Sequence, residues 1–241
     1  MTAPIGARRR AGGLRAAPAV VLLALGACGP SSPAGKPPAS GPMYQAFEVA
    51  FGKPAPWSTI DDGGDHIVYS PQALIDLRPG VVALISAKRI PGGCKSCGGA
   101  LAINYLRRDP SGFSRLGAWT DVGGQGVSGG VLPWTVRTDI DNGPTLVTRR
   151  DDTVGDCSST TDELITLAPQ GPVKIATVVV ATGYAPLPKD HGHPPHVSGT
   201  IVPMVRGERF AVVLSGTSSL RQVFRREGEV FTTYSPGATG C

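Results

Sequence analysis

Short runs of alternating apolar and polar residues, separated by glycine and proline, cover most of the chain after residue 66. Such period-two runs, bounded by turn residues, are typical of half-buried antiparallel strands. The first runs span residues 73–77 and 81–87, and the last spans residues 230–234. Among the turns between them, Asp141-Asn142-Gly143 predicts a tight hairpin, because asparagine and glycine adopt positive φ at little cost.

One segment before these runs has helical spacing instead. Met43, Phe47, Ala50 and Phe51 lie three or four positions apart, and Gly52 follows where a helix C-cap would stand. Residues 53–65 are rich in proline, glycine and aspartate and are expected to form a loop.

No segment between the predicted strands is long enough for a crossover helix, so a parallel sheet is disfavoured. The sequence therefore predicts an all-β domain: an antiparallel meander of about ten strands with one short N-terminal helix. A sandwich, a closed barrel and a small propeller all fit this pattern.

The N-terminus has a different character from the rest of the chain. Arg8, Arg9, Arg10 and Arg15 precede an apolar run over residues 16–27 that is too short to span a bilayer, which takes about 20 residues. This arrangement predicts an export signal over residues 1–27. An ordinary secretory signal, in which the following cysteine is coincidental, is the simpler alternative.

The end of this leader, Leu25-Gly26-Ala27-Cys28, resembles the lipobox of bacterial lipoproteins. The resemblance implies cleavage before Cys28, diacylation of its sulfur and anchoring of the mature N-terminus in a membrane. The residue after the cysteine is Gly29 and not aspartate. In Gram-negative bacteria this resembles lipoproteins that are sent on to the outer membrane, which implies that the protein is anchored there and faces the periplasm. Residues 28–42 then form a Pro/Gly/Ser-rich tether, and residues 43–241 form a single β-rich envelope domain.

Net charge adds little to this picture once the leader is removed. The whole chain is at +5, but the leader holds four arginines and no acid, which leaves 19 basic and 18 acidic residues in the mature protein. A nearly neutral protein in this compartment argues against nucleic acid as a partner. The expected partners are the membrane, through the lipid, and an envelope polymer or protein.

Four cysteines remain beside Cys28, an even number that favours disulfides in an oxidising compartment. The preferred pairing joins Cys94 to Cys97 and Cys157 to Cys241. Cys94-Lys95-Ser96-Cys97 also has the spacing of a redox pair, yet a strand follows it and not the helix that lowers such a thiol pKa. The run from Cys94 to Ala100 resembles a stretch of uncharacterised exported bacterial proteins, which implies no activity.

Two further motifs contain residue types that bind metals or nucleotides in other proteins. His191, His193 and His196 lie within six residues beside prolines, so the loop is either solvated or captures a metal ion. Residues 124–129 match a dinucleotide-binding glycine pattern but are followed by a strand, so they are interpreted as a flexible loop.

No acid, base and nucleophile stand together in a credible setting, and no cofactor is expected. The sequence thus favours a lipid-anchored binding or structural module without catalysis. Metal capture by the histidines and thiol-disulfide exchange at Cys94 and Cys97 are the alternatives.

Overall fold

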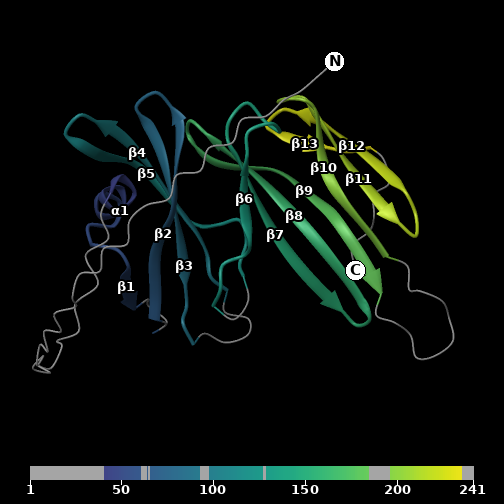
Figure 1. Ribbon diagram of the computed structural model, residues 1–241, viewed down its shortest axis with the longest axis horizontal. Helices are drawn as coiled ribbons and strands as arrows, with labels where there is room; N and C mark the ends of the chain where they lie inside the picture. The colour runs from purple at the N-terminus through teal and green to yellow at the C-terminus, as the bar shows by residue number, and fades with distance from the viewer. Residues whose placement is uncertain are drawn as a thin grey trace, which may run out of the picture. The chain divides into compact units, whose positions relative to one another are not determined.

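The computed structural model describes residues 41–60, 64, 66–92, 98–126, 129–184 and 196–234. They form one helix and thirteen strands, all paired antiparallel with their sequence neighbours within two sheets (Figure 1). The all-β prediction, with an antiparallel meander and one short N-terminal helix, is confirmed. No helix among the described residues is long and apolar enough to cross a membrane.

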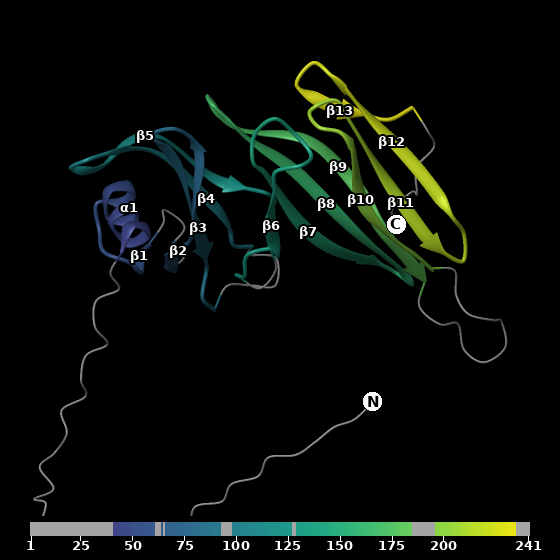
Figure 2. The ribbon, with the colours of Figure 1, turned by 45° about the horizontal axis from the view of Figure 1, so that its top comes forward.

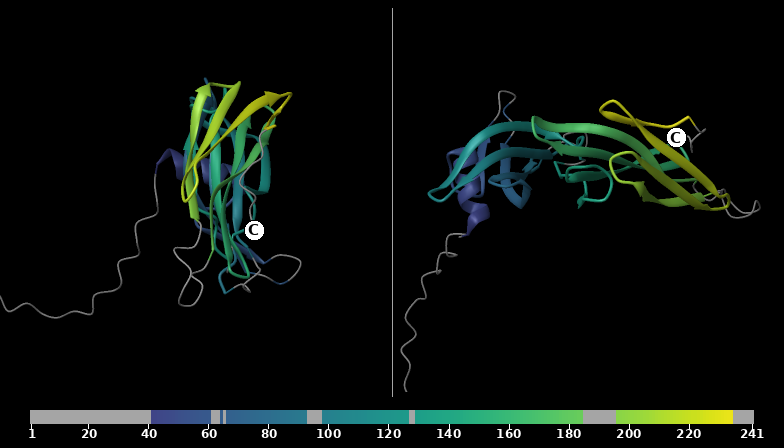
Figure 3. Two further views of the ribbon diagram at one scale, coloured as in Figure 1. Left: turned by 90° about the vertical axis from the view of Figure 1, so that its right-hand side faces the viewer. Right: turned by 90° about the horizontal axis from the view of Figure 1, so that it is seen from above.

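The helix α1 (Pro42–Phe51) has the bounds that its sequence pattern predicts. Proline stands in its first turn, where a missing N–H costs nothing, and Gly52 ends it in the left-handed conformation with φ of 66°. Its apolar face buries Ala46, Phe47 and Ala50 against the first sheet, on the side where α1 lies in Figure 3.

The first sheet has five strands in sequence order: β1 (Trp57–Ile60), β2 (His66–Arg78), β3 (Val81–Arg89), β4 (Ala100–Asp109) and β5 (Gly112–Val122). The prediction that residues 53–65 are all loop is wrong, because β1 pairs with the start of β2. The Trp57 and Tyr69 rings, opposite each other in that pairing, stack with centroids 5.3 Å apart and thereby stabilise the short strand.

The second sheet has eight strands, again in sequence order: β6 (Trp134–Arg137), β7 (Thr145–Val154), β8 (Cys157–Ala168), β9 (Gly171–Tyr184), β10 (His196–Val205), β11 (Arg209–Gly216), β12 (Leu220–Glu227) and β13 (Val230–Thr232). Although β13 is four strands away from β9 in this order, the two are in contact. The sheet therefore curls on itself (Figure 2).

Three apolar clusters form the core. One lies between α1 and the first sheet, and a second lies inside the curl of the second sheet around Phe210. The third joins the two sheets, because Ile103 and Tyr105 of β4 pack with Leu146, Ile165 and Leu167 of β7 and β8. This joint brings the turn after β2 close to the turn after β8.

The Tyr105 hydroxyl, in this joint, is buried and has no hydrogen-bond partner in the structure. Burial raises the pKa of Tyr105 above its ordinary value. The unfolded chain ionises near pH 10 while the folded chain keeps the phenol neutral. The contribution of Tyr105 to the free energy of unfolding is therefore fully present below pH 10. It is lost as the pH rises from there towards the higher pKa of the folded state.

We expect Tyr105→Phe to leave the free energy of unfolding at pH 7 unchanged or higher, since the hydroxyl gains nothing from its site. We also expect a smaller loss of stability in the variant than in the wild type between pH 9 and pH 11. Urea unfolding at both pH values measures this, with Tyr184→Phe, at a side chain 55% exposed, as control. A clear loss of stability for Tyr105→Phe at neutral pH would contradict the interpretation.

Candidate functional site

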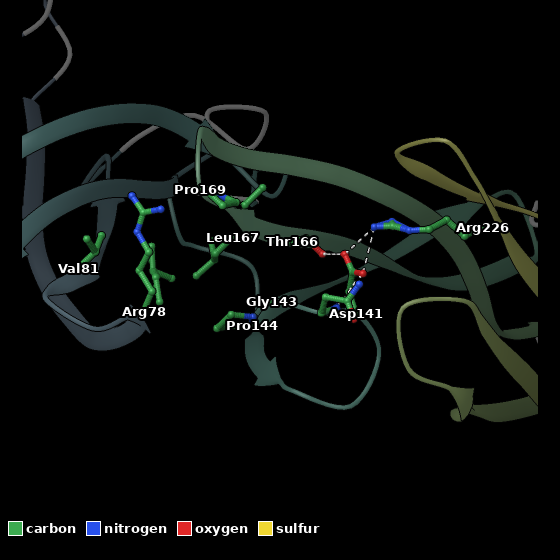
Figure 4. A pocket seen from close by; sticks show the side chains of 12 residues that line it. Arg78, Val81, Asp141, Gly143, Pro144, Thr166, Leu167, Pro169 and Arg226 are labelled. Carbon is green, nitrogen blue, oxygen red and sulfur yellow. Dashed lines mark hydrogen bonds and ion pairs between the residues drawn. The ribbon is translucent and has the colours of Figure 1, made fainter.

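A cavity of about 330 Å³ lies where the turn after β2, the β6–β7 connection and the turn after β8 meet (Figure 4). The apolar residues of its wall are Leu77, Val81, Pro144, Leu167, Ala168 and Pro169. Its charged residues are Arg78, Asp141 and Arg226. The volume is within the range of small-molecule sites, about 300–1,000 Å³.

Asp141 is 2% exposed, and its carboxylate is held by three groups. The Thr166 hydroxyl donates to it at 2.7 Å, the Asn142 backbone N–H at 2.8 Å, and Arg226 Nη2 at 3.1 and 3.2 Å to its two oxygens. Buried carboxylates are tolerated only when they are paired and hydrogen-bonded in this way. The carboxylate is therefore compensated from within the protein.

The backbone around Asp141 is fixed by the turn between β10 and β11. Arg206 donates through Nε to the Asp141 carbonyl and through Nη2 to the Asn142 carbonyl, both at 2.9 Å. The Gly207 N–H donates to the Ile140 carbonyl at 3.0 Å. A side chain at Gly207 would collide with the Asn142 amide, and its φ of 75° favours glycine.

The β6–β7 connection is thus not the tight hairpin that the Asp-Asn-Gly sequence predicts. Neither Asn142 nor Gly143 has positive φ, and the strands end at Arg137 and begin again at Thr145. The prediction is wrong because Asp141 serves as a buried ion-pair partner, and its contacts with β8, β12 and the β10–β11 turn outweigh the local turn preference.

Two guanidinium groups have hydrogen-bonding capacity left at this cavity. Arg226 Nη1 is buried without a partner, while the rest of the group lies 5.2 Å from the Phe231 ring centroid. Arg78 is exposed and forms no ion pair or hydrogen bond with any described residue. Figure 4 shows the two arginines on opposite sides of the lining, with Leu167 between them.

The charge of the lining is therefore +1: two guanidinium groups against one carboxylate that is already bonded. An anion with an apolar body complements such walls, because guanidinium groups bind carboxylate and phosphate oxygens well. A cation would meet no free acid there. The described lining contains no histidine, cysteine or lysine, the usual acid-base and nucleophilic side chains.

Most site residues predicted from the sequence fall outside the described part of the chain. These are Cys28, Cys94, Cys97, Cys241, His191 and His193, so lipidation, disulfide pairing and metal capture stay predictions. His196 is described and lies exposed at the start of β10. Cys157 is described and lies half-buried at the start of β8. Within the described ranges, no three His, Cys, Asp or Glu side chains gather as a metal site.

Charged side chains of β7 are paired with one another or with β8. Arg149 lies on an interior strand and donates at 2.7 and 2.8 Å to Asp162, its cross-strand neighbour, which is 2% exposed. On the same strand, Asp152 pairs with Arg150, and Asp151 accepts a hydrogen bond from the Thr160 hydroxyl.

The described glycines of the segment after β5 lie against the backbone at the start of β4 and the end of β3. The Gly99 N–H donates to the Gly130 carbonyl at 2.9 Å, and the Gly126 N–H donates to the Gly99 carbonyl at 2.8 Å. A Cβ at Gly129 would lie 1.9 Å from the Ile90 carbonyl oxygen. The glycines allow backbone to pack on backbone.

Comparisons of the chain with protein-family models, curated proteins and solved structures found no match.

Proposed function

We propose that this protein is a lipid-anchored envelope protein that binds a small anion with an apolar body in the cavity between its two sheets. The observation that carries the binding proposal is the pair of guanidinium groups with unused donors on either side of an apolar wall. The anchor rests on the lipobox resemblance at Cys28.

The binding mode follows from the two arginines. Arg78 is the last residue of β2, beside the turn to β3, and pairs with the carboxylate or phosphate of the ligand. Arg226 Nη1 supplies a second donor from the opposite side. The apolar body of the ligand packs on Leu167 and its neighbours, where each buried methylene contributes about 0.8 kcal/mol.

The anchor is tested by replacing its sulfur. We expect Cys28→Ser to abolish labelling of the protein with radioactive palmitate and to move it from the membrane to the soluble fraction, because two acyl chains account for stable attachment. Ser31→Ala, in the same tether, serves as the control and keeps the label. A Cys28→Ser protein that stays labelled and membrane-bound would contradict the anchor.

The binding site is tested with octanoate, a monocarboxylate with an apolar chain, by calorimetric titration of the full-length protein in detergent. We expect octanoate to bind and Arg78→Ala to weaken the binding about tenfold, the equivalent of one charged hydrogen bond. Arg89→Ala, at another exposed arginine that ends a strand, leaves the affinity unchanged.

Octanol distinguishes the contribution of the anionic group to binding from that of the apolar chain. Because it has the same chain length without the charge, we expect it to bind at least about tenfold more weakly than octanoate. Equal affinities for octanoate and octanol, or no effect of Arg78→Ala, would contradict recognition of the anionic group at this cavity.

A further inference from the structure

A second pocket, of about 260 Å³, lies on the face of the first sheet against which α1 packs, beside the edge strand β5. The helix contributes Ala50 and Phe51 to it, and the strands contribute Trp57, Tyr69, Ala102, Asn104, Arg115, Ala118, Trp119 and Thr120. The proposed anion site does not involve any of these residues.

Asn104 is the unusual member of this lining. It is 3% exposed, yet its amide makes no hydrogen bond with any described residue. Its partners across the sheet are Leu84 on β3 and Ala118 on β5, neither of which offers a polar side chain. The pocket therefore presents an amide donor and an amide acceptor to which an incoming molecule can hydrogen-bond.

The wall beside Asn104 is aromatic. The Phe51 centroid lies 5.0 Å from that of Tyr69 and 5.6 Å from that of Trp57. Trp57 and Tyr69 are nearly parallel, at 16°. Such amphipathic rings give flat apolar surfaces beside polar groups. At the open side, Arg115 and Thr120 are exposed on β5 and add polar groups to the rim.

We infer that this pocket binds a pyranose unit of a glycan. A sugar ring has an apolar C–H face for the aromatic wall and hydroxyl groups around its rim for an amide, a hydroxyl and a guanidinium group. An acyl chain would leave Asn104 unsatisfied. A free anion would meet one exposed arginine and mostly apolar walls. The pocket thus serves a ligand of a different chemical class from the cavity between the sheets.

The inference is tested on the full-length protein in detergent by calorimetry, with triacetylchitotriose and maltotriose as probes. We expect at least one trisaccharide to bind at millimolar concentration or better and to change the tryptophan fluorescence. Preference for triacetylchitotriose assigns the Asn104 amide to an acetamido group, and preference for maltotriose assigns it to ring hydroxyls.

Three variants locate the binding. Asn104→Ala and Trp57→Ala lower the affinity at least about tenfold. Arg115→Ala, at an exposed side chain that folding does not need, lowers it several-fold. Trp134→Phe and Gln72→Ala, away from the pocket, serve as matched controls and leave the affinity unchanged.

Stability measurements distinguish a ligand contact from a structural role for the amide. Asn104→Ala unfolds at the wild-type temperature or above it, because its amide has no partner to lose. Absence of binding by both trisaccharides overturns the inference. Binding that Asn104→Ala, Trp57→Ala and Arg115→Ala leave intact, or an Asn104→Ala protein that unfolds well below the wild type, also overturns it.

Discussion

Replacing Asp141 with alanine is expected to lower the free energy of unfolding by about 3–5 kcal/mol, the usual cost of breaking a buried ion pair from one side. The substitution leaves the Arg226 guanidinium group without its anion and the Thr166 hydroxyl without its acceptor. The Arg226 guanidinium group lies 5.2 Å from the ring centroid of Phe231, in the core cluster around Phe210. Because the same carboxylate joins the β6–β7 connection to β8 and β12, the loss affects three elements together.

Urea unfolding at neutral pH measures this effect, and Asp152→Ala is its matched control. Asp152 forms a shorter ion pair with Arg150, at 2.7 Å against 3.1 Å for Asp141 with Arg226, but the Arg150 and Asp152 side chains are 54% and 42% exposed. Exposed pairs contribute about 0–1 kcal/mol. A loss for Asp141→Ala no larger than that for Asp152→Ala would mean that the Asp141 network does not hold the cavity wall in place.

Phe210→Ala is expected to lower the free energy of unfolding by about 3–5 kcal/mol through the cavity that it leaves. The Phe210 ring is 0% exposed and stacks on Phe224 at 4.8 Å, with 7° between the planes. It also lies 5.1 Å from Phe231. These three rings belong to the core cluster inside the curl of the second sheet, so truncation of Phe210 leaves space among buried side chains.

Chemical unfolding followed by circular dichroism measures the loss, with Val213→Ala on the same strand as control. Val213 is 36% exposed because it projects from the other face of β11, so its truncation is expected to cost less than about 1 kcal/mol. Similar losses for both variants would contradict a core inside the curl. A change in the slope of unfolding against urea for Phe210→Ala alone would instead report a change in the compactness of the chain.

The fold class could be predicted because it depends on local features of the sequence. Period-two alternation, short connections and the proline and glycine that flank α1 all act within a few residues. The division into two sheets could not be predicted, because it depends on the contact of Ile103 and Tyr105 with residues 146–167. Strand β1 was missed because its four residues are stabilised chiefly by the stacking of Trp57 on Tyr69.

The candidate site was less accessible to sequence reasoning. Asp-Asn-Gly predicts a hairpin turn at Asp141, the commoner role for such a sequence. Its ion-pair partner Arg226 is 85 positions away, and only the curl of the second sheet brings the two together. One signal was present: an aspartate directly after the apolar Ile140, which the structure shows to be fully buried.

Native mass spectrometry of the full-length protein, released from its own membrane in detergent, measures whether the cavity retains an anion. We expect a polypeptide that begins at an acylated Cys28 and retains a small acidic molecule, with the molecule absent from Arg78→Ala and present in Arg89→Ala. The acylated polypeptide alone, in a sample that also fails to take up octanoate, would contradict anion binding at the cavity between the sheets.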